Sequence, residues 1–386
     1  MVEKPGDRIP PGSVVDIVDR DGQWVGRGFF NWHSRIALRL LTANADEAVD
    51  VDFFTRRIVR ALELRRNLLK LDEVTDACRL VHSEGDGLSG LIVDRFGATV
   101  VMEFFSAGMM RQRQVIQEIL TQLLPSPPVL QGRGAGGEGA EVQEKPQFYW
   151  FAEEHVQKQE SLDFHAPEPP APSVITEHGL RFRVAPGSKH KTGFFTDQRD
   201  NRKTLASFCA GKRVLDLCCN TGGFAVYAKA LGQAEDVVGV DLDEQAIALA
   251  KQNANLNQAK IRFVQGDLFT WLRDTRPSGE RYDVVILDPS KQTRDRDEID
   301  FALKRYFDMN KLALQAVAPG GIFLTCSCTG LISEEMFLET LRRAAWQAGR
   351  TLQVLKLAGA GADHPVLAHV PEGRYLKAVF CRVLEC

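Results

Sequence analysis

Several features that would decide the class of a protein are missing from this sequence. No apolar run approaches the roughly 20 residues that a helix needs to span a bilayer. The first residues, MVEKPGDRIPPG, are polar and contain no apolar stretch typical of a secretory signal. A Walker P-loop is also missing, which argues against phosphoryl transfer. We therefore expect a cytoplasmic protein without a membrane partner.

Cysteine and charge are limited in ways that exclude particular sites. The eight cysteines form no regular framework and include no Cys-x-x-Cys redox pair, so we expect them to be reduced. Cys326-Ser327-Cys328 lacks the second ligand pair of a structural zinc site, and the histidines suggest no ligand cluster, so we predict no metal. The net charge of −3 provides no global basic field, so any nucleic acid must be held by local basic segments.

The first part of the chain looks β-rich. The length of 386 residues predicts two or three domains. A hairpin is expected at 13–31, around an Asp-Gly turn, and a short strand at VDFF (51–54). Residues 53–70 then predict an amphipathic helix. Its polar face carries a group of arginines: Arg56, Arg57, Arg60, Arg65 and Arg66.

The middle of the chain predicts a small α+β domain and the last part a different architecture. Residues 79–105 favour a small antiparallel sheet, with a helix at about 109–124. Residues 125–146, rich in Gly, Pro and Glu, predict a mobile loop. From about residue 186, strands alternate with helices, which indicates a parallel sheet covered on both faces. The expected fold class is α/β, with domains at 1–73, 74–185 and 186–386.

A ligand site is expected where the strands of the last domain end. In VLDLCCNTGGF (214–224) a strand runs into a loop of small residues that opens a helix. Asp241 ends the next strand, about 20 residues further on, where a carboxylate can accept both hydroxyls of a ribose. Asp267 and Asp288 end the two strands that follow. A generic nucleotide fold such as an NAD enzyme is the alternative, but the pattern is more similar to class I S-adenosylmethionine methyltransferases.

The segment SKHKTGFFTDQRDNR (188–202) precedes the first strand of that domain. Phe194 and Phe195 could stack on an adenine, and Gln198 and Arg199 could contact a methionine carboxylate or an RNA backbone; a solvated helix start is the alternative. The predicted cofactor-binding residues are Phe195, Gln198, Arg199, Asp216, Cys218, Asn220, Gly222, Asp241, Leu242, Asp267, Leu268 and Asp288.

Four motifs together carry a family resemblance: HSEGDGLSGLIVDRFG, KTGFFTDQRDNR, VLDLCCNTGGFAVYA and TCSCTGLISEEMF. The chain resembles the bacterial 23S ribosomal RNA cytosine-5 methyltransferases that have an N-terminal PUA domain. The resemblance covers nearly the whole chain and implies a PUA RNA-binding domain, a small middle domain and a Rossmann-like methyltransferase domain. It departs at Asp288-Pro289-Ser290-Lys291, where the family usually has Asp-Pro-Pro-Lys.

The resemblance also implies a chemistry for the thiols. Carbon 5 of cytosine is a poor nucleophile until a thiolate adds to carbon 6, which is covalent catalysis by cysteine. By resemblance to the Thr-Cys-Ser motif, Cys326 is the nucleophile and Asp288 holds the base; Cys328 is the second candidate. Plain packing is the alternative for both thiols. The target base must leave its stack.

Two other functions stay open on the sequence alone: methylation of a guanine by the same fold, and RNA binding without catalysis. Basic side chains that could hold the RNA backbone are the five arginines of the N-terminal helix together with Lys189, Lys191, Arg199, Arg202 and Lys203, although a solvated charged face is the alternative. The oligomeric state stays open, a homodimer included.

Overall fold

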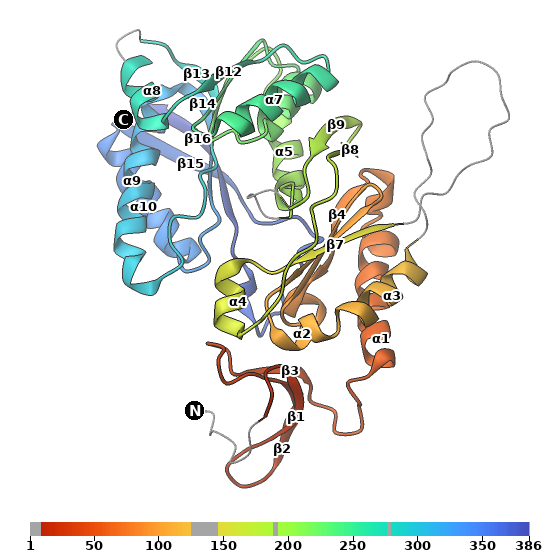
Figure 1. Ribbon diagram of the computed structural model, residues 1–386. Helices are drawn as coiled ribbons and strands as arrows, with labels where there is room; N and C mark the ends of the chain where they lie inside the picture. Colours follow the sequence, from red (N-terminus) through yellow and green to blue (C-terminus); the bar gives the residue numbers. More distant parts are fainter. Residues whose placement is uncertain (1–8, 125–145, 188–191, 276–278, 386) are drawn as a thin grey trace, which may run out of the picture. The chain divides into compact units, whose positions relative to one another are not determined.

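The computed structural model describes residues 9–124, 146–187, 192–275 and 279–385 (Figure 1). The chain forms two compact units. Unit 1 comprises residues 1–179, 184–196 and 362–370, and unit 2 comprises 180–183, 197–361 and 371–386. The finer boundaries expected at residues 73 and 185 stay a prediction. Most of the predicted loop 125–146, and also Lys189 and Lys191, lie outside the described residues.

Unit 1 begins with a three-stranded antiparallel sheet of order β1-β2-β3. Its strands are β1 (Ser13–Val18), β2 (Trp24–Phe30) and β3 (Leu38–Thr42). The predicted hairpin is confirmed, since β1 pairs with β2. Its turn is held by Asp19, whose Oδ1 accepts the N–H groups of Asp21 and Gln23, and Gly22 supplies a positive φ of 77°.

Helix α1 (Val51–Glu63) follows and continues in a π-helical turn at Leu64–Leu68. The strand predicted at VDFF (51–54) is therefore wrong. Asp50 favours a helix here, because its carboxylate accepts the N–H of Phe53 and caps the first turn of α1. The apolar face expected for this helix is present, with Phe53, Ile58 and Leu62 buried.

The sequence predicted Arg65 on the exposed basic face of α1, but the structure buries it. Its residue is 1% exposed, at the wide turn where α1 changes to π geometry. The guanidinium donates to both carboxylate oxygens of Asp86, at 2.7 and 2.8 Å, and to the carbonyl of Asp363 at 2.7 Å. A bidentate pair of this kind compensates the desolvation of a buried charge. The pattern of one helix cannot reveal this burial, because the partner lies in another segment.

A four-stranded sheet of order β4-β5-β6-β7 forms the rest of unit 1. Its strands are β4 (Ala77–His82), β5 (Leu91–Phe96), β6 (Thr99–Phe104) and β7 (Gln147–Phe151). The predicted antiparallel sheet is confirmed for β4 to β6, and β7 adds a parallel pairing with β6. The helix predicted at 109–124 is present as two pieces. The helices after β6 are α2 (Ala107–Arg111), α3 (Arg113–Leu123) and α4 (Glu154–Glu160), and β8 (Ser173–Glu177) follows them.

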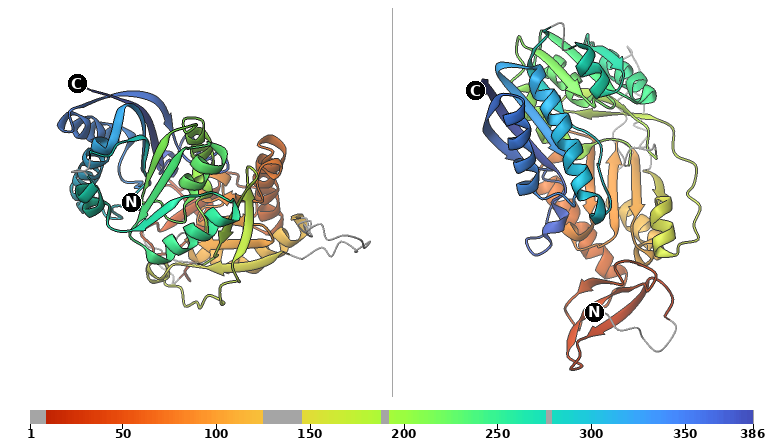
Figure 2. Two further views of the ribbon diagram at one scale, coloured as in Figure 1. Left: turned by 90° about the horizontal axis from the view of Figure 1, so that it is seen from above. Right: turned by 90° about the vertical axis from the view of Figure 1, so that its left-hand side faces the viewer.

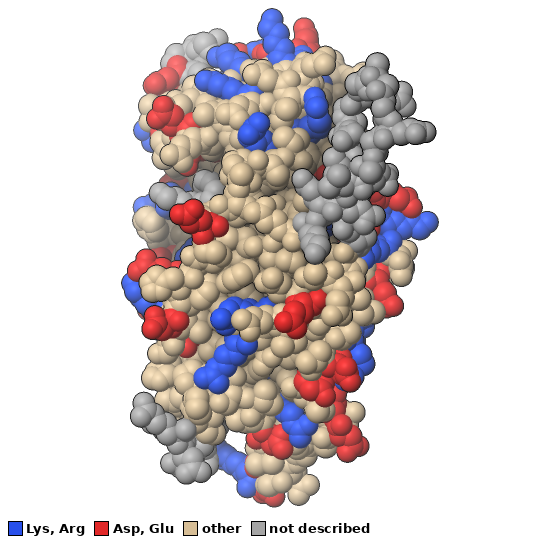
Figure 3. Space-filling model, turned by 45° about the vertical axis from the view of Figure 1, so that its right-hand side comes forward, with Lys and Arg blue, Asp and Glu red and all other residues tan. Residues whose placement is uncertain are grey.

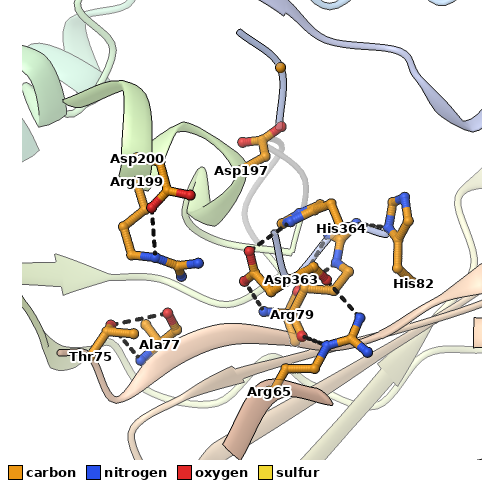
Figure 4. A network of polar contacts seen from close by, with 12 residues as sticks. Arg65, Thr75, Ala77, Arg79, His82, Asp197, Arg199, Asp200, Asp363 and His364 are labelled. Atoms are coloured by element: carbon orange, nitrogen blue, oxygen red, sulfur yellow. Dashed lines mark hydrogen bonds and ion pairs between the residues drawn. The ribbon is translucent and has the colours of Figure 1, made fainter. Parts of the chain in front are cut away.

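A buried polar network ties residues 362–370 to the sheet of unit 1 (Figure 4). Arg79 makes a bidentate pair with Asp94 at 2.7 and 2.8 Å, and its own N–H donates to Asp363 Oδ2 at 3.0 Å. The rings of His82 and His364 lie 5.1 Å apart in the same network. Burial, followed by the charge of Arg79, lowers the pKa of His82 to about 2, so this imidazole is neutral.

Unit 2 is built on a seven-stranded sheet of order β12-β11-β10-β13-β14-β16-β15. Its strands are β10 (Arg213–Leu217), β11 (Asp236–Asp241), β12 (Arg262–Gln265), β13 (Tyr282–Leu287), β14 (Val317–Ser327), β15 (Arg350–Ala358) and β16 (Lys377–Glu385); β9 (Leu180–Val184) precedes them. The alternation of strands and helices is confirmed. The sheet is parallel from β12 to β14, whereas β16 runs antiparallel to both of its neighbours. The sequence analysis missed the edge strand β15.

Helices cover both faces of this sheet (Figure 2). They are α5 (Arg199–Ala206), α6 (Gly223–Val226), α7 (Glu244–Leu256), α8 (Leu268–Thr275), α9 (Ile299–Ala316) and α10 (Glu334–Gln347). One core packs α9 and α10 on the strands, through Tyr306 and Phe337, and the other packs α5 and α6, through Leu205 and Phe224. Among the described residues, no helix combines the length and the apolarity that a membrane span requires.

Candidate active site

The carboxyl ends of the parallel strands in unit 2 gather acidic side chains at one edge of the sheet. Asp216 lies near the end of β10, Asp241 ends β11, and Asp288 directly follows β13. These strands are neighbours, with β10 between β11 and β13. The negative charges of Asp288 and Asp241 add to burial in raising the pKa of Asp216 well above its usual range. A cluster of like charges favours a ligand that brings positive charge.

Asp216 itself has an oxygen available for such a ligand. It is buried, and its Oδ2 accepts the N–H of Ala225 at 3.0 Å. Its Oδ1 is also buried and has no hydrogen-bond partner among the described residues. Because a buried acceptor without a partner is costly, this oxygen fits a ligand that donates a hydrogen bond or carries positive charge.

The loop between β10 and α6 has the tight conformation that its small residues predicted. Cys218, Asn220 and Gly222 all have positive φ, at 60°, 47° and 79°. Such backbone conformations cluster at ligand sites, where the surrounding structure holds them in place. Gly222 is needed for space as well, since a Cβ there would lie 3.1 Å from the ring of Phe263. Burial, together with Asp241, raises the pKa of the Cys218 thiol.

Asp241 holds that loop in place. Its Oδ2 accepts the N–H of Asn220 at 2.8 Å, and its Oδ1 accepts the N–H of Asp243 at 2.9 Å. Each oxygen keeps a lone pair for a ribose hydroxyl, so the predicted ligand role is compatible with this structural role. The next residue, Leu242, is 67% exposed.

Asp267 and Leu268 lie after the end of β12. The carboxylate of Asp267 is exposed and accepts the N–H of Thr270 at 3.0 Å, which caps α8. Leu268 is half-buried and packs on the core beside α9. Their predicted place at the adenine end of a cofactor stays a prediction.

The segment before α5 divides between the two units. Phe195 is half-buried and belongs to unit 1, whereas the other predicted site residues belong to unit 2. Gln198 is buried, and its Nε2 donates to Asp288 Oδ2 at 3.0 Å while its Oε1 accepts from Asn201. Gln198 therefore orients the carboxylate of Asp288.

Two of the predicted basic contacts are buried. Arg199 is 1% exposed, with its Nε 3.8 Å from Asp200 Oδ1 (Figure 4), and Arg202 is buried with its guanidinium 5.6 Å from the centre of the Tyr227 ring. This burial contradicts the prediction that they hold an RNA backbone. Contact of Arg199 with a cofactor stays a prediction, and Lys203 is exposed as expected.

The structure brings Cys326 and Asp288 together at the ends of the neighbouring strands β14 and β13. Cys326 is 0% exposed and packs in the core on the α5 side of the sheet. Burial and then the negative charge of Asp288 raise the pKa of its thiol, and a hydrogen bond with Gln198 opposes them. Gln198 thus contacts both groups, and the Cys326 thiol is protonated in this conformation.

Cys328 is the more accessible of the two thiols. It is half-buried in the loop after β14, and its Sγ lies 3.9 Å from the carbonyl oxygen of Pro289. The loop after β13 is fixed to the same segment, because the N–H of Gln292 donates to Thr329 Oγ1 at 3.1 Å. The two loops therefore present Cys328 and Asp288 on one rim.

Sequence reasoning missed two polar residues of this region. Tyr375 donates its hydroxyl hydrogen to Asp197 Oδ2 at 2.6 Å, and Lys377 is 3% exposed at the start of β16. A signal for Lys377 was present, because a lysine that opens the apolar run KAVFCRVL must be buried or cap its edge.

Comparisons with known proteins decide the family of this site. The profile of the S-adenosylmethionine-dependent methyltransferases matches residues 147–362. The chain belongs to this family. A PUA-like domain profile matches residues 1–43. The methyl donor of the family is S-adenosylmethionine, and the acidic edge with the unpaired oxygen of Asp216 fits its cationic methionine end.

Curated relatives of this methyltransferase extend over almost all of the chain. The ribosomal RNA large subunit methyltransferase I of Aeromonas hydrophila subsp. hydrophila is 39% identical over 380 residues, which cover 96% of this chain and 90% of the relative. The protein of the same name from Escherichia coli O127:H6 is 37% identical over 381 residues, which cover 97% and 91%. The resemblance to ribosomal RNA methyltransferases is confirmed.

Solved structures support the fold of this methyltransferase. SMU.776, named as a methyltransferase and solved in complex with SAH, matches with a TM-score of 0.80 at 21% identity, over 97% of this chain and 92% of that chain. A structure from Streptococcus mutans, named as SAM-dependent, matches with a TM-score of 0.78 at 20% identity, over 97% and 93%. The predicted α/β class with a Rossmann-like methyltransferase part is confirmed.

Proposed function

We propose that this methyltransferase acts on large-subunit ribosomal RNA and forms 5-methylcytosine. The RNA class is supported by the names of its relatives. The position on the base is supported by one observation: two thiols lie beside a carboxylate where the parallel strands end. Methylation of carbon 5 needs such a nucleophile, whereas methylation of a heteroatom does not.

In the proposed reaction the thiol attacks the base and the carboxylate of Asp288 holds it in place. A thiolate adds to carbon 6 of the ring, and the electron pair of the 5,6 double bond makes carbon 5 nucleophilic. When bound, S-adenosylmethionine supplies the methyl group. A base then takes the proton from carbon 5, whose bonding pair restores the double bond as the thiolate leaves carbon 6. Asp288, oriented by Gln198, holds the nitrogen edge of the ring through this sequence.

Exposure separates the two candidate thiols. Cys326 lies beside Asp288, but it is fully buried and its neighbours favour the protonated thiol. Cys328 is half-buried in the loop after β14, so its thiol is the more accessible of the two to an incoming base. We therefore take Cys328 as the attacking thiol of this conformation. The prediction for Cys326 remains the alternative, and the paired variants described below separate the two.

We propose that local clusters of Lys and Arg hold the RNA, because the net charge of −3 gives the molecule no overall positive field. Lys and Arg side chains alternate with Asp and Glu on the face shown in Figure 3. On α1, Arg56 and Arg60 are exposed, and Arg57 lies beside them with its pKa lowered by burial and by these two cations. Glu47 partly neutralises this cluster through Arg56 and Arg57. The PUA-like segment precedes α1 in the same unit.

Nucleoside analysis tests the proposal directly. Unmodified large-subunit ribosomal RNA is incubated with the protein and labelled S-adenosylmethionine, digested, and examined by mass spectrometry. We expect the label in 5-methylcytidine. Label in a methylated guanosine would overturn the assignment to cytosine, and binding of S-adenosylmethionine without transfer to this RNA would overturn the proposed substrate.

A further inference from the structure

Lys377 is a buried cation for which the methyltransferase fold itself gives no reason. The residue is 3% exposed at the start of β16, paired in register with Ser327 of β14. Its Nζ donates to two carbonyl oxygens, of Thr329 at 2.7 Å and of Tyr375 at 2.9 Å. Among the described residues it forms no ion pair with a carboxylate. Burying an ammonium with neutral partners alone is costly, so a compensating negative charge is expected near it.

The charged and titratable groups near Lys377 indicate which of them supplies the compensating negative charge. Glu334, at the start of α10, faces it but is already paired with Arg374 at 2.9 Å. Lys291, in the loop after β13, repels it. Cys328 is the remaining group: it directly precedes Thr329, whose carbonyl accepts from Lys377 Nζ, and a negative charge on its sulfur would raise the pKa of Lys377. Burial lowers the pKa of Lys377 to about 8, and a thiolate at Cys328 opposes this change.

The groups around Cys328 show why a cation is needed. Asp288 and Cys326 lie close by: the negative charge of Asp288 adds to burial in raising the pKa of the Cys326 thiol, and Cys326 precedes Cys328 by two residues. Tyr306 of α9 faces it through its hydroxyl, which bonds Thr329 at 2.9 Å. The Pro289 carbonyl can only accept a hydrogen bond and so favours the protonated thiol. Lys377, anchored on the carbonyl of Thr329, favours the charged form of Cys328.

We propose that Lys377 is a positioning residue that holds Cys328 as a thiolate, and so makes this thiol rather than Cys326 the reactive one. The ammonium is anchored on the carbonyl of Thr329, the residue that follows Cys328, which fixes the charge beside the loop that carries the thiol. Beyond burial, the negative charges of Asp288 and Cys328 both raise the pKa of the Cys326 thiol. The catalytic meaning of the proposal rests on the function proposed above, but the state of the thiol does not.

The test reads the thiolate without RNA or methyl donor. The intact protein is alkylated with iodoacetamide over a range of pH, and labelling of Cys328 is measured by peptide mass spectrometry. We expect Lys377→Met to move the midpoint of alkylation up by one pH unit or more, which is about tenfold slower labelling near neutral pH. Lys377→Arg keeps the charge and should keep the midpoint. Lys356→Met removes an exposed lysine of β15 and serves as the matched control.

The alkylation results test the role of Lys377 independently of whether the protein forms 5-methylcytidine. An unchanged midpoint in Lys377→Met, with the thermal unfolding temperature preserved, overturns the role of Lys377. If the methionine variant does not fold, Lys377→Gln keeps a donor for the carbonyls and gives the same readout. A shifted midpoint in a protein that forms no 5-methylcytidine would support Lys377 and overturn only the proposed reaction.

Discussion

At the scale of single residues, the candidate site depends on two thiols in one short segment that differ in access. Cys326 is enclosed by the core, and Cys328 faces the rim beside Pro289. The sequence placed both thiols at the end of a strand, which the structure shows. Their exposure was not readable, because it depends on Gln198 and on the partner strand β16, which are distant in the chain.

Paired cysteine variants separate the roles of the two thiols. Cys328→Ala should reduce methylation by about a thousandfold or more, because the covalent step is lost. Cys326→Ala should keep most of the activity and lose on the order of 1 kcal/mol of stability by opening a small space in the core. Activity is measured as methyl transfer to RNA, and binding of S-adenosylmethionine by calorimetry.

Cofactor binding is the control for both variants, and we expect it to change by less than about threefold because neither thiol holds the donor. Full activity in Cys328→Ala would remove this thiol from the mechanism. A folded but inactive Cys326→Ala would return the role of nucleophile to Cys326, as the family motif suggested.

At the scale of elements, the loop between β10 and α6 gives a prediction with an internal control. Gly222 has a φ of 79° and a neighbour 3.1 Å from its missing Cβ, whereas Gly211 has a φ of 66° and open space around it. Gly211→Ala should cost only the backbone strain, about 1 kcal/mol. Gly222→Ala adds a clash with Phe263 and Ala250, so we expect a larger loss of stability.

The same pair separates fold from function. Denaturant unfolding gives the stability of each variant, and calorimetry gives its affinity for S-adenosylmethionine. Gly222→Ala should weaken cofactor binding at least tenfold, while Gly211→Ala should leave the affinity unchanged. Equal effects of the two substitutions on binding would show that this loop does not contact the cofactor.

Helices and strands were predictable where nearby residues determine them, and less predictable where residues distant in the chain determine them. The strand–loop–helix at 214–224 and the hairpin at 13–31 follow from apolar alternation and turn residues nearby. Arg65 was misplaced because its partner, Asp86, lies 21 residues away. Strand β15 was missed because it is mostly exposed at an edge and a register shift between Val354 and Lys356 interrupts its alternation.

At the scale of the whole molecule, the buried network of unit 1 predicts sensitivity to acid. His82 has a pKa of about 2 in the folded state and an ordinary value near 6.5 when unfolded. The unfolded state therefore binds more protons below pH 6.5, and stability is full above this pH and falls below it. The slope should approach about 1.4 kcal/mol per pH unit from this residue.

Replacing the imidazole tests that assignment. His82→Gln should lessen the fall in stability between pH 7 and 5, measured by urea unfolding at each pH. His155→Gln is the matched control, because His155 is exposed and pairs with Glu153. The same pH slope in His82→Gln as in the unchanged protein would mean that other groups carry the acid sensitivity.

The broad organisation of the molecule was readable from its sequence, since a β-rich start and a Rossmann-like end have different periodicities. The division into two compact units was not, because unit 1 includes residues 362–370, which lie within the sequence range of the methyltransferase part. Asp363 joins that segment to Arg65 and Arg79, and a carboxylate with such remote partners leaves no local signal.

The most direct test of the account is a covalent trap. In RNA that contains 5-fluorocytidine in place of cytidine, fluorine replaces the hydrogen on carbon 5 and cannot leave as a proton does, so a thiol that adds to carbon 6 stays attached after methyl transfer. We predict a denaturation-resistant adduct of protein and RNA that requires S-adenosylmethionine, maps to the peptide containing Cys326 and Cys328, and is absent from Cys328→Ala. Continued formation of 5-methylcytidine by a variant lacking both cysteines, with no adduct from the unchanged protein, would contradict the account.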